Sequence, residues 1–369
     1  MNSKKPFDFL IFLTVLILLS IGTIMVFSSS APHAYNYMQG DTYYFLKKQL
    51  TYAPVGLLAM IVTMNIDYRK LGKWSPVFLI GSIVLLVLVL VPGIGAEFNG
   101  SRRWIRIGTQ PLQPSEIAKL SLILFFAHSL SRKKDGIKSF FKGLLPYLII
   151  IGIFGFLLLK EPHMSVTMVI CMVCSIILFC AGAKIKHFLI LGVPAVAGAV
   201  VLMLASDYRR DRVMSFLNPW ADMQGGGWQI VQSLYAIGSG GLFGRGLGKS
   251  LQKFLYIPEP YNDFILAVLA EELGFIGVLT VLLLFLIFIW RGVKVSMNAP
   301  DVFGSLVAIG ITSLIAVQVI LNVAVVTSSM PVTGVPLPFL SYGGTSLVFL
   351  MSGVGILLNI SRYSNYERI

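Results

Sequence analysis

Long apolar runs separated by short polar stretches dominate this chain. Most runs approach the length of about 20 residues that a helix needs to cross a bilayer core about 30 Å thick. In lipid, a spanning segment must be a helix or part of a closed barrel, and continuous apolar runs do not suit barrel strands. We therefore predict an all-α polytopic membrane protein, one domain over 1–369, with ten transmembrane helices near 8–28, 50–66, 74–92, 115–131, 143–159, 163–183, 187–206, 263–290, 303–326 and 345–361.

Two polar segments interrupt this pattern. The segment 207–262, between the seventh and eighth predicted helices, is predicted to be a large extracytoplasmic loop with a glycine-rich part at 225–248. A second extracytoplasmic loop, 327–344, belongs to a stretch with three prolines and three glycines between 331 and 346. Proline fixes the backbone and removes donors, so this stretch cannot be regular helix. Irregular chain at membrane depth indicates a lined cavity or a re-entrant segment.

Basic residues give the expected orientation. The first run follows Lys4 and Lys5 and superficially resembles a signal peptide, but its length and the nine runs after it favour an uncleaved anchor. More than half of the 29 lysines and arginines fall in short segments on the side of the two termini. We therefore expect both termini of this multi-pass membrane protein to be cytoplasmic.

Composition excludes an ordinary soluble domain, because 56% of the residues are hydrophobic and only 12% are charged, against about 25% charged in soluble proteins. The net charge of +13 does not indicate nucleic acid, since no basic domain is separable from the helices. Several basic residues cluster in the outward loops, where they either attract lipid headgroups or form a cradle for phosphate or pyrophosphate, which arginine binds bidentately. These residues are Arg102, Arg103, Arg106, Arg209, Arg210, Arg212, Arg245, Lys249 and Lys253.

Asp263 is the most informative acid. It opens the eighth predicted helix at the outer boundary of the membrane, directly after the segment 258–262. It could merely cap that helix and complement its dipole. Beside a basic, aromatic and glycine-rich loop, it could instead be a general base next to an anionic leaving group.

Ionisable residues inside the predicted spans are expected to face a cavity or a partner. Glu116 and Lys119 are three residues apart and would share a helix face, either as a structural ion pair or as part of a functional site. Glu271 and Glu272 lie deeper in the eighth predicted helix, and their roles stay open.

Several motifs, in order, resemble the SEDS family of bacterial cell-wall polymerases, the relatives of FtsW, RodA and SpoVE, over essentially the full length. The residues that carry this resemblance are 99–105, 113–119, 228–233, Pro258-Glu259, 263–265 and 331–346, while 217–220 and 252–254 look most similar to FtsW and SpoVE.

This resemblance implies a peptidoglycan glycosyltransferase that polymerises lipid II into β-1,4 glycan strands at the outer membrane face, for septal or spore-cortex synthesis. Asp263 matches the essential acid of the family. Together, the resemblance and the charge pattern make substrate-binding candidates of Arg102, Arg103, Glu116, Lys119, Arg209, Arg212, Gln229, Gln232, Arg245, Lys253 and Ser341.

The family also implies partners. These are lipid II, a class B penicillin-binding transpeptidase and membrane lipids, but no nucleic acid. A divalent cation, Mg²⁺ or Mn²⁺, is expected to be carried by the substrate, because no cluster of acidic and histidine residues marks a dedicated metal site. A lipid II flippase and a non-enzymatic scaffold of the division or sporulation machinery stay open as alternatives.

The chain departs from the family pattern at the start of the sixth predicted helix. Relatives commonly have Gln-Pro-Asp-Leu-Gly-Thr where this chain has 161–166, with Glu161 and His163. The role of the family's aspartate is therefore not carried over, and His163 either tunes lipid or partner contacts or faces solvent. Asn262 stands where a threonine is usual.

Overall fold

The computed structural model of the chain describes residues 6–98, 101–108, 110–133, 137, 139–188, 190, 192, 198, 214–221, 225 and 227–364. Most of the seventh predicted run, 187–206, and the candidates Arg209, Arg210 and Arg212 lie outside these residues.

Helices form along the apolar runs. Among the residues described, six helical segments are long and apolar enough to cross a membrane, namely Phe9–Tyr37, Tyr68–Leu90, Phe140–Lys160, Ile265–Met297, Val302–Val326 and Gly344–Ser361, as expected of a multi-pass membrane protein. The described elements are α1 (Phe9–Tyr37), α2 (Tyr44–Asn65), α3 (Tyr68–Leu90), α4 (Pro114–Lys133), a π-helical turn η2 (Phe140–Leu144), α5 (Leu145–Lys160), α6 (Met164–Cys180), α9 (Trp228–Gly240), α10 (Ile265–Met297), α11 (Val302–Val326) and α12 (Gly344–Ser361).

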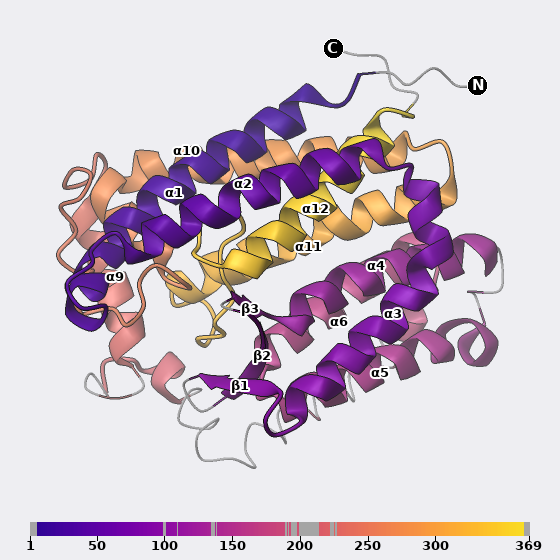
Figure 1. The fold of residues 1–369 in the computed structure, drawn as a ribbon, viewed down its shortest axis with the longest axis horizontal. Helices are drawn as coiled ribbons and strands as arrows, with labels where there is room; N and C mark the ends of the chain where they lie inside the picture. Colours follow the sequence, from indigo (N-terminus) through magenta and orange to yellow (C-terminus); the bar gives the residue numbers. More distant parts are fainter. Residues whose placement is uncertain are drawn as a thin grey trace.

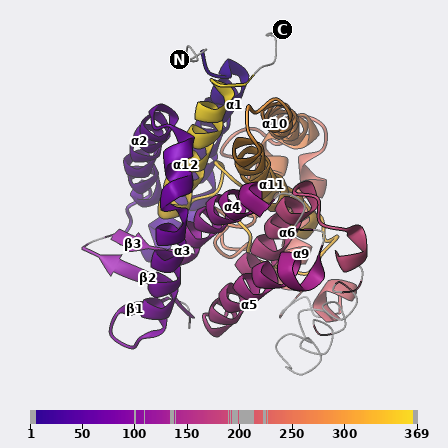
Figure 2. The ribbon, with the colours of Figure 1, turned by 90° about the vertical axis from the view of Figure 1, so that its right-hand side faces the viewer.

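The helices form two adjoining groups. In Figure 1, α1, α2, α10, α11 and α12 run side by side, and α3 to α6 pack together below them. Figure 2 shows α11 near the centre, where it contacts α4, α6, α10 and α12. Helix α11 therefore contacts helices of both groups.

The two ends of the described chain meet at one end of the bundle. The backbone N–H of Asp8 donates to Ser361 Oγ at 3.0 Å, and the Asp8 carboxylate accepts from the Arg291 guanidinium at 2.9 and 2.6 Å. Asp8 and Arg291 are 5% and 7% exposed. This buried ion pair ties α1 to the far half of α10.

A small sheet corrects the all-α prediction. The predicted loop between α3 and α4 holds three antiparallel strands in the order β1 (Gly95–Phe98), β2 (Ser101–Ile107) and β3 (Gln110–Leu112). Strand β2 holds Trp104 and Ile105, which are aromatic and β-branched residues typical of strands, between Arg103 and Arg106. The arginines of this segment, expected in a loop, therefore lie on a strand.

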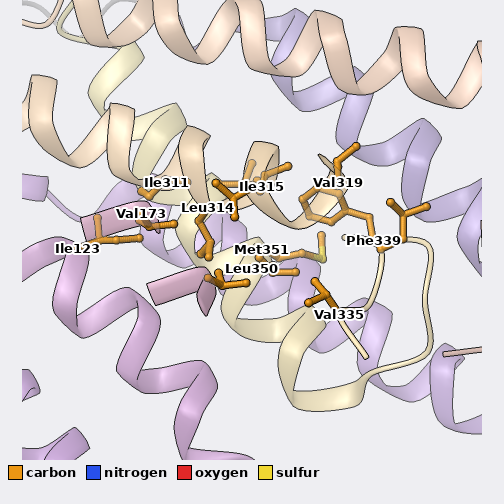
Figure 3. Packing of buried hydrophobic residues seen from close by; sticks show 14 of the residues in the cluster. Ile123, Val173, Ile311, Leu314, Ile315, Val319, Val335, Phe339, Leu350 and Met351 are labelled. Carbon is orange, nitrogen blue, oxygen red and sulfur yellow. The ribbon is translucent and has the colours of Figure 1, made fainter. Parts of the chain in front are cut away.

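The proline- and glycine-rich stretch is irregular over 331–343, as predicted, and packs into the bundle, whereas its last residues, 344–346, already belong to α12. Val335 and Phe339 are buried, and Figure 3 shows both beside Val319 of α11 and Met351 of α12. Gly22 of α1 permits this packing, because a Cβ at that position would overlap the backbone of Phe339 and Leu340. The lack of a side chain at Gly22 therefore allows the segment 331–343 to pack against α1.

Gly22→Ala is expected to destabilise the protein by about 1–3 kcal/mol, the usual range for overpacking, because only backbone atoms meet the new methyl group. Gly81→Ala in α3 is the matched control, since nothing lies within 4 Å of its added Cβ. Thermal unfolding in lipid nanodiscs should show a lower Tm for Gly22→Ala and an equal or higher Tm for Gly81→Ala. Equal Tm values for Gly22→Ala and the unaltered protein would contradict this packing.

Candidate functional site

Asp263 lies in irregular backbone just before α10. That helix begins at Ile265, and its N-cap residue is Phe264, with no side-chain cap hydrogen bond. The prediction that Asp263 opens the helix was therefore two residues early, and Asp263 is not the N-cap residue of α10.

The backbone around Asp263 is hydrogen-bonded to the segment 331–343. The carbonyl of Asn262 accepts from Ser341 Oγ at 2.6 Å, and the carbonyl of Tyr261 accepts from the N–H of Tyr342 at 2.9 Å. Ser341 Oγ also accepts from the N–H of Leu337 at 2.8 Å. Ser341, a predicted substrate-binding residue, thus joins two irregular segments.

Asn322 of α11 completes this arrangement. Its side-chain Nδ2 donates to the carbonyl of Asp263 at 2.7 Å and to the carbonyl of Val335 at 2.8 Å. Sequence reasoning missed this residue. The available signal was a lone amide inside an apolar helix, because polar groups at membrane depth usually serve a site or a partner.

A pocket of about 270 Å³ opens beside Asp263. It is lined by Gln229, Pro258, Glu259, Asn262, Asp263 and Phe264. The structure thus brings the candidate Gln229, on α9, together with Asp263. Glu259 accepts from Asn262 Nδ2 at 2.7 Å. This volume is close to the lower end of the range of about 300–1,000 Å³ for small-molecule sites, so it suits one end of a larger substrate.

Aromatic rings pack behind this backbone. Tyr261 lies 4.2 Å from Phe45, 5.3 Å from His33 and 6.0 Å from Tyr342, measured between ring centroids. Burial raises the pKa of the Tyr261 and Tyr342 phenols above their ordinary value, so both stay neutral. The rings form an apolar wall that holds the backbone of the pocket in place.

Arg103 of β2 lies against the turn between α5 and α6. It donates to the carbonyls of Glu161, at 3.2 Å, and Pro162. Glu161 and His163 are buried, at 1% and 7% exposed, so the solvent-facing alternative for His163 is wrong. Burial raises the pKa of Glu161 to about 8, against the opposing effect of Arg103. Glu161 is therefore mostly neutral at pH 7.

Glu116 and Lys119 pair within α4, as predicted, at 2.9 Å and almost fully buried. They line a second, very small cavity of about 10 Å³ whose other walls come from α4, α11 and α12. The two residues do not line the Asp263 pocket. Helix α11 contacts both this cavity and the backbone at Asp263. Its residue Ile315, in the Glu116–Lys119 cavity, lies seven residues before Asn322, which is about 10 Å along the helix at 1.5 Å per residue.

A break in α10 is bound to the loop that follows α9. Gly274 has a non-helical backbone (φ 67°, ψ −168°). The N–H groups of Arg245 and Gly246 donate to the carbonyls of Glu271 and Glu272 at 2.9 and 3.0 Å. The glycine is required, because a Cβ there would overlap backbone atoms of Leu242 and Gly244.

The two glutamates at this break are fully buried and hydrogen-bonded. Glu271 accepts from Ser250 Oγ and from the N–H of Leu251. Glu272 accepts from Ser28 Oγ at 2.7 Å and from Lys253 Nζ at 2.8 Å. Lys253, a predicted substrate-binding residue, thus has its ammonium engaged inside the protein.

The other predicted residues are dispersed. Arg245 is partly exposed and lies 3.6 Å from Glu271. Arg102 pairs at the surface with Glu97 at 3.1 Å, and Gln232 is buried in α9. Arg209 and Arg212 lie outside the described residues. Across the part of the chain that the structure describes, no three His, Cys, Asp or Glu side chains form a group that could hold a metal ion.

Comparisons with known proteins agree on one family. The family model for the FtsW/RodA/SpoVE group, described as cell cycle protein, matches residues 8–366. Stage V sporulation protein E of Bacillus subtilis is 49% identical, over 99% of this chain and 100% of that protein. A probable peptidoglycan glycosyltransferase FtsW of Trichlorobacter lovleyi is 46% identical, over 97% of this chain and 95% of that protein.

A solved structure has the same fold. It is described as "Structural coordination of polymerization and crosslinking by a peptidoglycan synthase complex". Its matching chain has a TM-score of 0.80 and 29% identity, covering 96% of this chain and 98% of that chain.

Glu161→Gln is expected to make stability less dependent on pH. The pKa of Glu161 is raised in the folded protein from about 4.5 to about 8. The stability from burying the neutral acid is therefore complete below pH 4.5 and is lost as the pH rises through 8. One pKa unit corresponds to about 1.4 kcal/mol, so the loss reaches about 2–5 kcal/mol by pH 8.5.

Thermal unfolding from pH 5 to pH 8.5 checks this. The Tm of Glu161→Gln should equal that of the unaltered protein at pH 5 and exceed it at pH 8.5. Glu97→Gln, at an exposed glutamate paired with Arg102, is the control and should leave the pH dependence unchanged. A Tm difference between Glu161→Gln and the unaltered protein that stays constant with pH would show that Glu161 is ionised when folded.

Lys253→Met should destabilise the protein by about 3–5 kcal/mol, because it leaves the buried Glu272 carboxylate without its cation. The double variant Lys253→Met/Glu272→Gln should recover much of that loss. Chemical unfolding in nanodiscs measures both. Equal stability of the single and double variants would show that Lys253 stabilises the protein by something other than its ion pair with Glu272.

Proposed function

The chain belongs to the FtsW/RodA/SpoVE family, and we propose that its peptidoglycan glycosyltransferase activity is carried out in the pocket beside Asp263. The observation that carries this proposal is the position of Asp263, which lines a pocket of about 270 Å³ and whose backbone is hydrogen-bonded on both sides. The reaction joins disaccharide-pentapeptide units of lipid II into β-1,4 glycan strands.

Asp263 acts as the general base. Its carboxylate accepts the proton of the acceptor sugar's 4-hydroxyl as that oxygen attacks the anomeric carbon of the donor chain. The new C–O bond forms as the bond from the anomeric carbon to the undecaprenyl pyrophosphate oxygen breaks, with inversion. The leaving group departs with the electron pair of that bond.

The negative charge on the pyrophosphate requires cations. Among the described arginines, Arg245 is partly exposed on the loop that follows α9, whereas Arg103 already donates to two backbone carbonyls. We propose that Arg245 binds the pyrophosphate, a role that the family resemblance also implies for Arg209 and Arg212, which lie outside the described residues. A divalent cation would arrive with the substrate and would neutralise part of the same charge.

The proposed topology places this chemistry at the outer membrane face. It has ten transmembrane helices, cytoplasmic termini and extracytoplasmic loops at 207–262 and 327–344. The contact of Asp8 with Ser361 supports it, because it brings the first and last helix ends together. Arg69 and Arg362 lie near that end of the bundle and fit the positive-inside rule.

We also propose a class B penicillin-binding transpeptidase as the partner and septal or spore-cortex wall as the product. The solved relative described as a peptidoglycan synthase complex that coordinates polymerization and crosslinking supports the partner. Stage V sporulation protein E, at 49% identity, supports the role in sporulation.

Asp263→Asn should lower polymerisation of labelled lipid II by about 10²–10⁴-fold, the usual contribution of a general base. Glycan chains made by the protein with its cognate transpeptidase, resolved on a gel, provide the measurement. Asp41→Asn is the control, because Asp41 is a surface acid paired with Lys47. Polymer at the unaltered rate from Asp263→Asn would favour the scaffold, and transfer of lipid II across vesicles without polymer would favour the flippase.

A further inference from the structure

Asn322 occupies a position from which it can fix the direction of the Asp263 side chain. It is 1% exposed and lies in α11, which contacts helices of both groups. Both of its N–H donors are used, one on the carbonyl of Asp263 and one on the carbonyl of Val335. The two acceptors also establish the orientation of the Asn322 side-chain amide. Its NH2 group must face them, because its oxygen in that place would meet two carbonyl oxygens and form no hydrogen bond.

The contacts hold both peptide planes that flank Asp263. The carbonyl of Asn262 belongs to the peptide before the Asp263 Cα, and Ser341 Oγ donates to it at 2.6 Å. The carbonyl of Asp263 belongs to the peptide after that Cα, and Asn322 donates to it at 2.7 Å. Peptide units are planar, so fixing these two planes fixes φ and ψ of Asp263. The direction of its Cα–Cβ bond follows.

The same amide also holds the segment beside the carboxylate. Val335, its second acceptor, follows Gly334, whose φ is +68°. A Cβ on Gly334 would lie 3.1 Å from Asp263 Oδ2. Asn322 therefore fixes the base and the neighbouring backbone relative to each other with one rigid group.

We propose that Asn322 is a positioning residue for this reaction, acting through the peptide backbone to aim the Asp263 carboxylate into the pocket lined by Gln229 and Phe264. This inference rests on the proposed role of Asp263 as the base. Asn322 does not line that pocket and is not expected to touch the substrate. Its loss should lower kcat with little effect on KM, because binding is kept and only the geometry of proton transfer is disturbed.

The test compares Asn322→Asp with Asn359→Asp. Asn359 of α12 is also fully buried and also binds irregular backbone through its amide, donating to the carbonyl of Met64 at 2.8 Å and accepting from the N–H of Tyr68 at 3.0 Å. It lies at the opposite end of the bundle. Both variants remove a side-chain amide donor at nearly constant shape, so a merely structural loss should be similar in the two.

The kinetics of lipid II polymerisation give the readout, normalised to folded protein by size-exclusion and thermal unfolding. Asn322→Asp should lower kcat by about 10²-fold, the scale for a misplacement of about 1 Å, with KM changed less than threefold. Asn359→Asp should lower Tm while kcat stays within threefold. Ser341→Ala releases the other peptide plane and should also lower kcat, which keeps the test decisive if Asn322→Asp fails to fold.

A folded Asn322→Asp with normal kcat would overturn the inference, as would a rise in KM alone or an equal loss of kcat in Asn359→Asp. If Asn322→Asp does not fold, normal kcat in Ser341→Ala would overturn it. Asp263→Asn distinguishes failure of the positioning role of Asn322 from failure of Asp263 as the base. If that variant is inactive, such results refute only the role of Asn322. If it is active, the proposed base fails and the positioning role fails with it.

Discussion

Hydrogen bonding of irregular backbone inside an apolar bundle is the constraint on which this structure depends. Lipid and packed side chains offer no water to peptide groups, so each break in a helix must find its partners within the protein. Around Asp263, the partners come from Asn322, Ser341 and Tyr342. At the break in α10, they come from the backbone of the loop after α9, because Gly241 and Leu242 accept from Phe275 and Ile276. The backbone around Asp263 and the break in α10 thereby each acquire one defined geometry.

Buried charged side chains also find their partners within the protein. Asp8 pairs with Arg291, Glu116 with Lys119 and Glu272 with Lys253, each within about 3 Å. Glu161 is the contrasting case, since its carboxyl oxygens are buried and have no hydrogen-bond partner among the described residues. Burial raises its pKa to about 8, so the group is neutralised by a proton instead of a cation. A polar site can thus sit in an apolar bundle without isolated charges.

Much of this could be predicted from the sequence, because a long apolar run in lipid must satisfy its own backbone hydrogen bonds and is therefore helical. The apolar runs, the irregular segment 331–343 and the pairing of Glu116 with Lys119 followed from composition and spacing. Asp263 could be singled out because of the polar segment before it. The partners of Lys253 and Asn322 could not, because these contacts join segments that are distant in sequence. The strands at 95–112 were missed because like residues stand in adjacent pairs, Arg102-Arg103 and Trp104-Ile105, and so hide the alternation of period two that predicts a strand.

The most direct test of the central claim is a cryo-EM structure of the protein in lipid nanodiscs with a lipid II analogue bound. The account predicts sugar density in the pocket lined by Gln229 and Phe264, with an acceptor hydroxyl at about 3 Å from the Asp263 carboxylate. The Asp263 and Asn262 carbonyls should still be bound to Asn322 and Ser341. Sugar density elsewhere, for example at the Glu116 and Lys119 cavity, with Asp263 out of reach, would contradict it.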